Sequence, residues 1–194
     1  MEPDFSGSFN GLHELEELFL HKSNMSQLQI GAFNGLYNLE WLQLDNNQIT
    51  SLPANIFSHL KTCELLILKH HQIFVIEPGA FNGLSSLNRL ALDNNYLTEI
   101  QPESFNGLSS LKVLYLQRNS LTTLDSSVLT PVPRPLNIAM SDPWESGDKT
   151  WDCPSLCWMK TEEQAGTIGW HPFGFGAIFK PKCSDGSNWD DLKC

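Results

Sequence analysis

Apolar residues recur along the chain with a fixed period of 24 residues. Phenylalanine marks this period at Phe9, Phe33, Phe57, Phe81 and Phe105. The segments that begin there read FNGLHELEELFL, FNGLYNLEWLQL, FSHLKTCELLIL, FNGLSSLNRLAL and FNGLSSLKVLYL. A fixed period of about 20 to 50 residues is typical of a solenoid, in which each unit buries its apolar face only against its neighbours. The pattern therefore predicts a stack of about five similar units.

Each unit repeats the same order of leucines and one asparagine. In the second unit these positions are Leu39, Leu42, Leu44, Asn47, Ile49 and Leu52. The order L-x-x-L-x-L-x-x-N-x-L resembles that of leucine-rich repeats. The L-x-L alternation predicts a short strand with one face inward, and the asparagine is expected to satisfy backbone groups where the chain leaves it. The resemblance implies an α/β leucine-rich-repeat solenoid with a curved parallel β-sheet on its concave face.

Three residues depart from the repeat. Ser23 and His71 stand where the pattern has asparagine, and Cys63 replaces the first leucine of its unit. A thiol is a small apolar group that substitutes well for leucine in a core. We therefore expect Cys63 to be free, buried and unreactive, and His71 to take the place of an asparagine.

The repeat weakens after Leu124, and the composition changes. A proline-rich turn at residues 129–135 precedes one last strand pattern at Leu136, Ile138 and Met140. Four of the five cysteines follow, at Cys153, Cys157, Cys183 and Cys194. The end of a solenoid needs a cover for its core, and a small disulfide-bonded cap is one solution. We expect repeats over residues 1–128 and a C-terminal cap over 129–194.

The four clustered cysteines allow three disulfide pairings, and the sequence alone does not choose among them. A zinc site is the alternative, but C-x-x-C and a neighbouring histidine pair are both missing, so no metal is expected. Asp142-Pro143-Trp144 and the later cysteines resemble the cap of extracellular leucine-rich-repeat proteins, whose usual form is N-P-W-x-C-x-C. Here Asp142 replaces the asparagine, and Cys153 and Cys157 are spaced C-x-x-x-C. The resemblance implies the pairs Cys153–Cys183 and Cys157–Cys194.

Disulfides predict an oxidising compartment, hence a secreted protein or a cell-surface ectodomain. Asn24-Met25-Ser26 is a glycosylation acceptor sequence that fits this location. No segment approaches the about 20 apolar residues of a membrane span, so direct membrane insertion is not expected. The net charge of −10 argues against a general nucleic-acid binder. Phosphate-loop, nucleophile-elbow and metalloprotease motifs are missing, so we expect neither an enzyme nor a cofactor.

The outward positions of the strands form the predicted concave face. Large apolar groups are expected there at Phe19, Trp41, Leu65, Ile67, Val113 and Tyr115. Such a patch on an open sheet is typical of a contact surface. The alternative is that neighbouring side chains or the cap shield it. Charge is graded along the same face, acidic at Glu16, Glu17, Glu40 and Glu64 and basic at Arg89, Lys112 and Arg118. An ordinary solvated surface is the alternative interpretation of these charges.

Two further segments are candidate contact surfaces. Residues 167–179 space aromatic residues with glycine and proline, which predicts a loop that presents Trp170, His171, Phe173 and Phe175, with Phe179 in the core. No cysteine precedes Cys63, so the disulfide-bonded N-terminal cap common in this family is not expected. An uncovered first unit around Leu12, Leu15, Leu18 and Leu20 favours self-association.

The 24-residue repeats, the cysteine-bonded cap and the aromatic insertion together resemble the variable lymphocyte receptors of jawless vertebrates. Members of that family recognise antigen through the concave strands and the cap loop. The resemblance implies immune recognition of microbial surface components or protein antigens, the ligand being a protein, a glycan or an anionic polymer. The alternatives are a cell-adhesion or receptor-ectodomain module and a homodimer. The candidate ligand-binding residues are Phe19, Trp41, Gln43, Leu65, Ile67, Arg89, Lys112, Tyr115, Arg118, Trp170, His171, Phe173 and Phe175.

Overall fold

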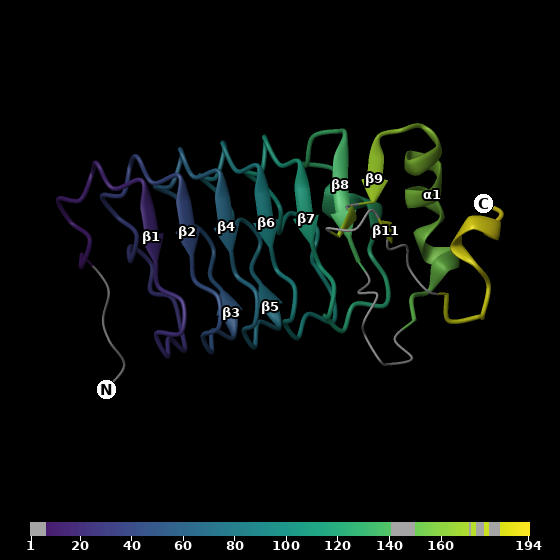
Figure 1. The fold of residues 1–194 in the computed structure, drawn as a ribbon, viewed down its shortest axis with the longest axis horizontal. Coiled ribbons are helices and arrows are strands. Elements are labelled where there is room, and N and C mark those ends of the chain that lie inside the picture. The colour runs from purple at the N-terminus through teal and green to yellow at the C-terminus, as the bar shows by residue number, and fades with distance from the viewer. Residues whose placement is uncertain (1–6, 141–149, 171, 174–176, 179–182) are drawn as a thin grey trace.

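The chain folds into a solenoid in which each turn contributes one short strand to a continuous sheet (Figure 1). The computed structural model describes residues 7–140, 150–170, 172–173, 177–178 and 183–194, and within 170–182 it describes only the backbone. Asp142, Trp144, His171, Phe175 and Phe179, which the sequence analysis singled out, lie outside the described residues.

The main sheet is parallel, and its described part has seven strands in the order β1-β2-β4-β6-β7-β8-β9. Their bounds are β1 Glu17–Phe19, β2 Trp41–Gln43, β4 Leu65–Ile67, β6 Arg89–Ala91, β7 Val113–Tyr115, β8 Leu136–Ala139 and β9 Ile168–Trp170. From β1 to β7 each residue pairs with the one 24 positions later, as Leu42 does with Leu66. The predicted parallel solenoid is confirmed, and its sheet continues past residue 128 through β8 and β9.

The inward leucines and the phenylalanines fill the core between the sheet and the convex side. Leu42, Leu66, Leu90 and Leu114 are fully buried. The phenylalanine rings form a continuous column, with centroids 5.7 Å apart for Phe33 and Phe57, 6.1 Å for Phe57 and Phe81, and 5.8 Å for Phe81 and Phe105. One ring per turn at this spacing keeps the convex side in contact from unit to unit. The core is thus continuous along the stack.

Tight turns, and no helices, cross the convex side of residues 7–124. A 24-residue unit leaves too short an arc for a helix, and the backbone closes turns such as Leu84 N–H to Phe81 O at 3.2 Å instead. A second short parallel sheet, β3 Ser51–Leu52 and β5 Val75–Ile76, joins two units. In the described part of the chain the one α-helix is α1, Cys157–Gln164, in the cap. The expected α component therefore lies outside the repeats.

Glycine in the convex turn has two different consequences along the stack. Gly107 has a φ of +94°, and an added Cβ would lie 2.6 Å from Phe81 O and 2.9 Å from Asn82 Cα. Gly11 occupies the same position of the first unit with a φ of +90°, but nothing lies within 4 Å of its Cβ position. The first substitution meets backbone atoms and the second meets open space. The pair therefore separates conformational cost from steric cost.

We expect Gly107→Ala to lower the free energy of unfolding by about 3 kcal/mol and Gly11→Ala by about 1 kcal/mol. The shared part is the cost of a left-handed backbone for an L-residue, about 1 kcal/mol. The difference is the displacement of the Phe81 and Asn82 backbone by the new methyl group. Urea denaturation followed by circular dichroism measures both values. Equal losses of unfolding free energy in the two variants would show that the backbone at Phe81 and Asn82 shifts at little cost to make room for the methyl group.

A ladder of buried asparagines follows the strands. Asn119 Nδ2 donates to Leu92 O and to Leu116 O at 2.9 Å each, and Asn119 Oδ1 accepts from Leu97 N–H at 3.1 Å. Asn47 and Asn95 have equivalent roles, whereas Ser23, at the end of the ladder, is exposed. These bonds satisfy backbone groups that turn away from the sheet, as the repeat pattern predicts.

His71 fills the ladder position between Asn47 and Asn95, as expected, but does so incompletely. Its Nδ1 accepts from Ile49 N–H at 3.3 Å, so its proton is assigned to Nε2. That Nε2 is buried, and its approach to Leu44 O falls short of hydrogen-bond geometry. Burial lowers the pKa of His71 to about 4, against an ordinary 6.5. The side chain is therefore neutral in the folded protein at pH 5, where the unfolded chain binds a proton.

We expect His71→Asn to stabilise the protein by about 1 kcal/mol at pH 7, because asparagine removes the unpaired N–H. The gain grows on acidification. Between pH 6.5 and about 4 the unfolded parent binds more protons than the folded one, so its stability falls as the pH falls, by about 3 kcal/mol in all. Urea midpoints measured from pH 7 to 4.5 test this. If parent and variant lose stability in parallel, His71 does not titrate as described.

Cys63 is the free, fully buried cysteine that the sequence predicts. Burial raises the pKa of its thiol to about 12, so little thiolate forms at neutral pH.

The cap closes the far end of the solenoid with two disulfides. Cys153 bonds to Cys183 and Cys157 to Cys194, the pairs that the family resemblance implies. Lys160 is buried in the cap, and its Nζ donates to Trp189 O at 3.1 Å and lies 3.8 Å from Glu163 Oε2. Three short 3₁₀ helices complete the described elements, at Ser126–Leu129, Cys153–Leu156 and Trp189–Asp191.

The segment predicted as an aromatic loop contains regular structure. Its first part is β9, which pairs with β8, and then β10, Pro172–Phe173, pairs antiparallel with β11, Ala177–Ile178. Gly169 explains why a strand fits there. Gly169 lies opposite Asn137, and a Cβ at Gly169 would lie 2.6 Å from Asn137 Oδ1. The glycine that indicates a loop in the sequence permits close approach of two strands.

Candidate ligand-binding surface

Strand register arranges the concave face in two main columns. The first column holds Glu17, Trp41, Leu65, Arg89, Val113 and Asn137, and the second holds Phe19, Gln43, Ile67, Ala91, Tyr115 and Ala139. Because side chains alternate across a strand, both columns point away from the leucine core. The solvent-facing side of the sheet is therefore built from these residues.

The apolar part of this face is smaller than predicted. Phe19 is 45% exposed and meets Trp41 edge to face, with centroids 5.0 Å apart. Leu65, Ile67 and Tyr115 are half-buried. Val113 was expected on the open face but is buried, because a short branched side chain is shaded by its longer neighbours in the first column. Shielding by neighbours, the alternative interpretation, thus applies to part of the patch.

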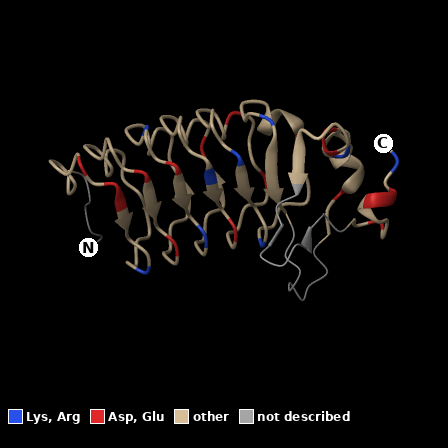
Figure 2. Ribbon diagram, turned by 45° about the horizontal axis from the view of Figure 1, so that its top comes forward, with Lys and Arg blue, Asp and Glu red and all other residues tan. Residues whose placement is uncertain are grey.

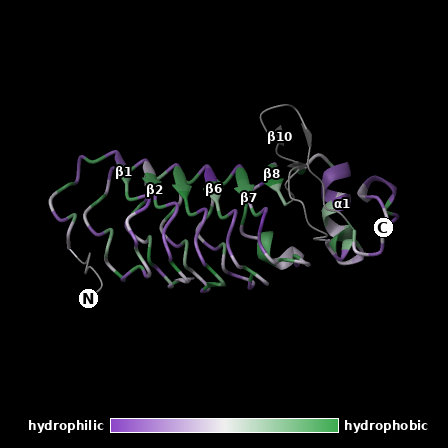
Figure 3. Ribbon diagram, turned by 60° about the horizontal axis from the view of Figure 1, so that its bottom comes forward, coloured by the Kyte–Doolittle hydropathy of each residue, from purple (hydrophilic) through white to green (hydrophobic). Residues whose placement is uncertain are grey.

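Charge changes along the stack (Figure 2). Glu16, Glu17, Glu40 and Glu64 are exposed at the first three strands. Arg89 on β6 and Lys112 just before β7 are exposed basic residues, and Figure 3 shows the hydrophilic patch at β6 beside the apolar β7. Arg118 lies beyond the end of β7, where its Nη1 is 3.5 Å from Asn94 Oδ1. The basic residues therefore concentrate over β6 and β7.

Two adjacent depressions lie over β4 to β8. The first, the Lys112 pocket, measures about 540 Å³ and is lined by Glu64, Leu65, Asn88, Arg89, Lys112, Val113 and Asn137. The second, the Asp93 pocket, measures about 280 Å³ and is lined by Leu65, Ile67, Lys69, Arg89, Ala91, Asp93, Tyr115 and Gln117. Leu65 and Arg89 line both. The two pockets are thus neighbours, with the Arg89 side chain at their junction.

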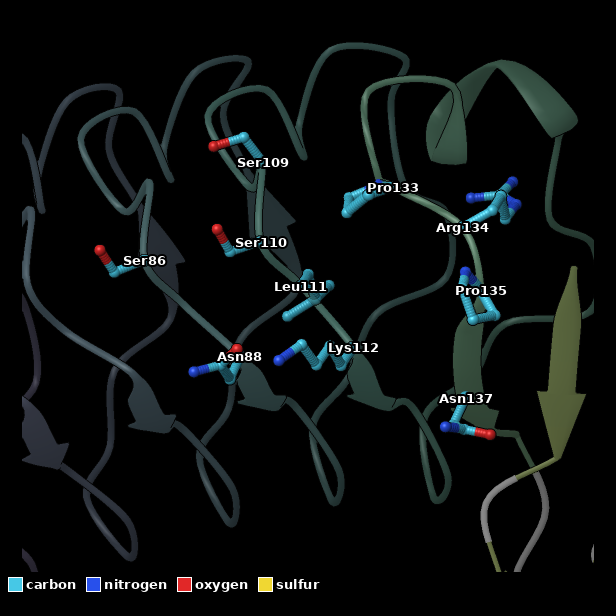
Figure 4. Close-up of a pocket in the computed structure, with 10 residues that line it drawn as sticks. All are labelled: Ser86, Asn88, Ser109, Ser110, Leu111, Lys112, Pro133, Arg134, Pro135 and Asn137. Atoms are coloured by element: carbon cyan, nitrogen blue, oxygen red, sulfur yellow. The ribbon is translucent and has the colours of Figure 1, made fainter.

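A third depression, of about 520 Å³, lies at the N-terminal ends of β6, β7 and β8 (Figure 4). It shares Asn88, Lys112 and Asn137 with the Lys112 pocket. Figure 4 shows the Lys112 side chain pointing toward Asn88, whereas Arg134 points away toward the cap. Arg134 is engaged there, because its Nε lies 3.3 Å from Glu162 Oε2 and its Nη1 donates to Val132 O at 2.9 Å. Lys112 is therefore the cation that serves both depressions.

The Asp93 pocket has buried polar groups on its wall. Burial raises the pKa of Asp93, while a bond from Asn94 Nδ2 at 2.9 Å and the charges of Lys69 and His70 act against the rise. Gln117 is 4% exposed, and its Oε1 has no hydrogen-bond partner. Burial also raises the pKa of Tyr115, where the charge of Arg89 opposes the rise and that of Asp93 adds to it. Tyr115 therefore lies within the electrostatic reach of both groups.

Asp45 occupies the position equivalent to Asp93 two units earlier, and its carboxylate has hydrogen-bond partners on both oxygens. Gln43 Nε2 donates to Asp45 Oδ1 at 2.6 Å, and Asn46 donates to Oδ2. Burial raises the pKa of Asp45, but these bonds and the charge of Lys69 outweigh it and hold the pKa below its ordinary value. The amide of Gln43 is thus committed to Asp45. Gln43, a predicted ligand contact, therefore has less hydrogen-bonding capacity for a ligand than the sequence suggests.

The predicted site residues divide into three groups. Leu65, Ile67, Arg89, Lys112 and Tyr115 meet at the two pockets. Phe19, Trp41, Gln43 and Arg118 lie on the face but line neither of these pockets. Trp170 and Phe173 belong to β9 and β10, of which only the backbone is described, and His171 and Phe175 lie outside the described residues.

The 24-residue spacing places Lys69, Asp93 and Gln117 in one column beside the strands, and Asn88 and Ala91 in two others. Sequence reasoning did not select these five residues, nor Asn137, as ligand contacts, although all six line the pockets. The burial of Asp93 and Gln117 is the property that spacing does not show. Asn137 joins the face through β8, which follows the last full repeat.

The described residues contain no group of three or more His, Cys, Asp and Glu side chains arranged to hold a metal ion. Within the same residues, no helix has the length and apolar character needed to cross a membrane.

The leucine rich repeat family model matches residues 5–49, 37–97, 62–121 and 85–134, which together span more than half of the chain. Curated proteins show no match. Among solved structures, the crystal structure of a TLR13-ssRNA13 complex matches 80% of this chain with a TM-score of 0.66 and 24% identity. This chain spans 21% of that one, so the likeness supports the fold alone. The chain belongs to the leucine rich repeat family.

Proposed function

We propose that this protein is an extracellular immune recognition module that binds its ligand on the concave face, centred on Arg89. The observation that carries the proposal is the junction of the Lys112 and Asp93 pockets at this residue. The two pockets combine apolar walls with charged and amide groups, which is the composition of binding sites. Microbial surface components and protein antigens are the ligand classes proposed.

An open recognition surface fits this face better than a catalytic centre. Arg89 and Lys112 are exposed, and Glu64 beside them is exposed as well. Catalysis relies on enclosed sites that shift pKa values and exclude water. Broad, shallow surfaces with a few anchoring side chains are typical of macromolecular contacts. The proposal is therefore a binding function without chemistry.

Two features support an extracellular location. The cap holds two disulfides, which persist in oxidising compartments. Asn24, in the glycosylation acceptor sequence, is exposed. Its Oδ1 accepts from Gln48 Nε2 at 2.6 Å, and this bond does not use Nδ2, the atom to which a glycan would be attached. Secretion or display on a cell surface remains the proposed setting.

The cap segment is proposed to complete the binding face, as it does in variable lymphocyte receptors. β9 continues the main sheet, with Trp170 opposite Ile138. The chain then enters the β10–β11 pair directly from this strand. The segment that contains Trp170 and Phe173 therefore leaves the sheet beside β8, which carries Asn137 of the Lys112 pocket.

Nucleic acid must be considered as a ligand, because one solved structure similar to this chain is that of a TLR13-ssRNA13 complex. This chain has a net charge of −10, and four exposed glutamates line the start of its concave face. A long polyanion would meet that acidic end. We therefore propose a protein or glycan ligand and not nucleic acid.

A binding array of microbial glycans, microbial proteins and a single-stranded RNA tests the proposed function. The parent protein is compared with Tyr115→Ala and Trp41→Ala on the concave face. Tyr96→Ala is the matched control, because Tyr96 is 59% exposed and belongs to neither column of the concave face. We expect the concave variants to lose about tenfold or more in affinity for a genuine ligand, and the control to bind like the parent. Concave variants that bind like the parent would contradict the assignment.

A homodimer is the second candidate, and the first strand favours it. Among the described residues β1 pairs only with β2, and Leu12 before this strand and Phe19 at its end are 47% and 45% exposed. Unpaired strand edges and exposed apolar groups promote pairing with another chain. Light scattering across concentration and salt measures the mass. If the concave face closes the dimer, Glu40→Lys with Glu64→Lys should weaken it most at low salt.

A further inference from the structure

One buried acceptor on the wall of the Asp93 pocket lacks a hydrogen-bond donor. Gln117 lines this pocket and its Oε1 is buried without a partner, so a rotation of the amide that brings this oxygen to the pocket would let a ligand supply the missing bond. Asp93 is 9% exposed and, unlike Asp45, has no glutamine in the position of Gln43, where its own unit has Ala91. The pocket therefore suits a ligand that donates hydrogen bonds.

The Lys112 pocket has the opposite character. Arg89 and Lys112 are exposed and form no ion pair or hydrogen bond with another side chain in the described part of the protein. Asn88 and Asn137 add amide groups to the same wall, and its one carboxylate, Glu64, is outnumbered by the two cations. Guanidinium and ammonium groups are donors only, and they bind carboxylates through charge-assisted hydrogen bonds. This pocket therefore suits a ligand that carries negative charge.

Because Arg89 and Leu65 line both pockets, one ligand can reach both. The Asp93 pocket, at about 280 Å³, is at the small end of ligand sites, which range from about 300 to 1,000 Å³. Ile67, Leu65 and Tyr115 give it apolar walls. A sugar ring has this combination of features, with hydroxyl donors at its rim and C–H groups on its faces.

We infer that the concave face recognises an acidic sugar residue, with its carboxylate at Arg89 and Lys112 and its hydroxyl groups donating to Gln117 Oε1 and the Asp93 carboxylate. This inference rests on the proposed function, since it names the ligand class of the same surface. It extends that function by assigning Asp93 and Gln117, which the sequence analysis did not select.

Other ligand classes satisfy fewer of these groups. A neutral sugar would leave Arg89 and Lys112 without a counter-ion. A simple carboxylic acid would leave Gln117 Oε1 unpaired. A long polyanion such as RNA would extend beyond the Lys112 pocket toward Glu40, Glu17 and Glu16 on the earlier units, where like charges repel it.

The test is calorimetric or NMR titration of the full chain with two matched sugar pairs. Glucuronic acid is compared with glucose, and galacturonic acid with galactose, so that each pair differs only by a carboxylate in place of the C6 hydroxymethyl group. We expect each acid to bind at least about tenfold more tightly than its neutral partner, because charge-assisted hydrogen bonds are about twice as strong as neutral ones. Salt should weaken the acids more than the neutral sugars.

Two variants locate the contacts. Arg89→Gln, at an exposed site, should reduce the acids to the affinity of their neutral partners. Gln117→Met removes the amide acceptor at similar size and should weaken acid and neutral sugar alike by several-fold. Lys61→Gln makes the same change of charge at an exposed residue outside both pockets and should leave every affinity unchanged. Circular dichroism checks the fold of each variant.

The outcomes separate this inference from the proposed function. Equal affinities for acid and neutral sugars, or acid binding unaffected by Arg89→Gln, would overturn the inference even if Gln117→Met fails to fold. The inference would also be overturned if a protein or RNA from the array binds through Tyr115 and no acidic sugar binds. The proposed recognition function would still be supported in that case. If no array ligand depends on the concave face, both the inference and the proposed function are contradicted.

Discussion

Replacing Asn95 with alanine is expected to lower the free energy of unfolding by about 4 kcal/mol. Asn95 Nδ2 donates to Leu68 O at 2.8 Å and to Leu92 O at 3.0 Å, and its Oδ1 accepts from Ile73 N–H at 3.1 Å. Leu92 O keeps a second bond from Asn119 Nδ2, but no other bond is found for the Leu68 carbonyl in place of this amide. Two buried backbone groups are then left unsatisfied, at about 1 to 3 kcal/mol each.

A histidine at this position should give a stability between those of asparagine and alanine. His71 shows that histidine fits a ladder site and satisfies one backbone N–H, so Asn95→His should cost less than Asn95→Ala. Asn38→Ala is the control, because Asn38 is exposed and bonds only to Glu14 Oε2 at 3.4 Å. Urea denaturation should rank stability as parent and Asn38→Ala together, then Asn95→His, then Asn95→Ala. Alanine and histidine with the same cost would show that the ladder bonds contribute little.

Removing the Cys153–Cys183 disulfide is expected to destabilise the cap by about 4 kcal/mol. The two cysteines are separated by 30 residues, and the chain-entropy account gives about 3 to 4 kcal/mol for a closed loop of that size. Both sulfurs are buried, and the backbone beside them joins the cap, since Ser184 N–H donates to Trp151 O at 2.8 Å. Paired substitution of both cysteines by alanine therefore loses packing as well as the crosslink.

The second disulfide is the matched comparison. Cys157 and Cys194 are separated by 37 residues, so their loop entropy is similar, but Cys194 is exposed and Cys157 is half-buried. We expect the Cys157/Cys194 double variant to lose less stability than the Cys153/Cys183 one. Tryptophan fluorescence reports the cap, which contains Trp151, Trp158 and Trp189. Equal losses would mean that burial of Cys153 and Cys183 adds nothing beyond the crosslink.

The repeats could be predicted from the sequence because one physical rule is applied five times. Leucine at alternating strand positions must face inward, and asparagine must satisfy the backbone that leaves the sheet, so Leu66 and Asn95 are placed by spacing alone. His71 followed from the same register. Regular repetition lets local pattern determine tertiary position, which is unusual outside solenoids.

The rest depended on contacts that spacing does not encode. Val113 is buried by neighbours in its own column, although its outward register was read correctly. β9 pairs with β8 across a long sequence interval, and the close fit of Gly169 against Asn137 in this pair is not visible from spacing. The candidate site shows the same limit. Arg89 and Tyr115 were found from register, but the unpaired Gln117 oxygen is visible only once side chains are placed.

Hydrogen–deuterium exchange, measured with and without a ligand taken from the array, tests the central claim most directly. The account predicts slower exchange in peptides over residues 64–69, 88–93, 112–117 and 136–140, which carry the two pockets. Convex turns at residues 57–60 and 81–84 should exchange unchanged. Protection confined to the convex turns, or to the open edge of β1, would contradict recognition through the concave face.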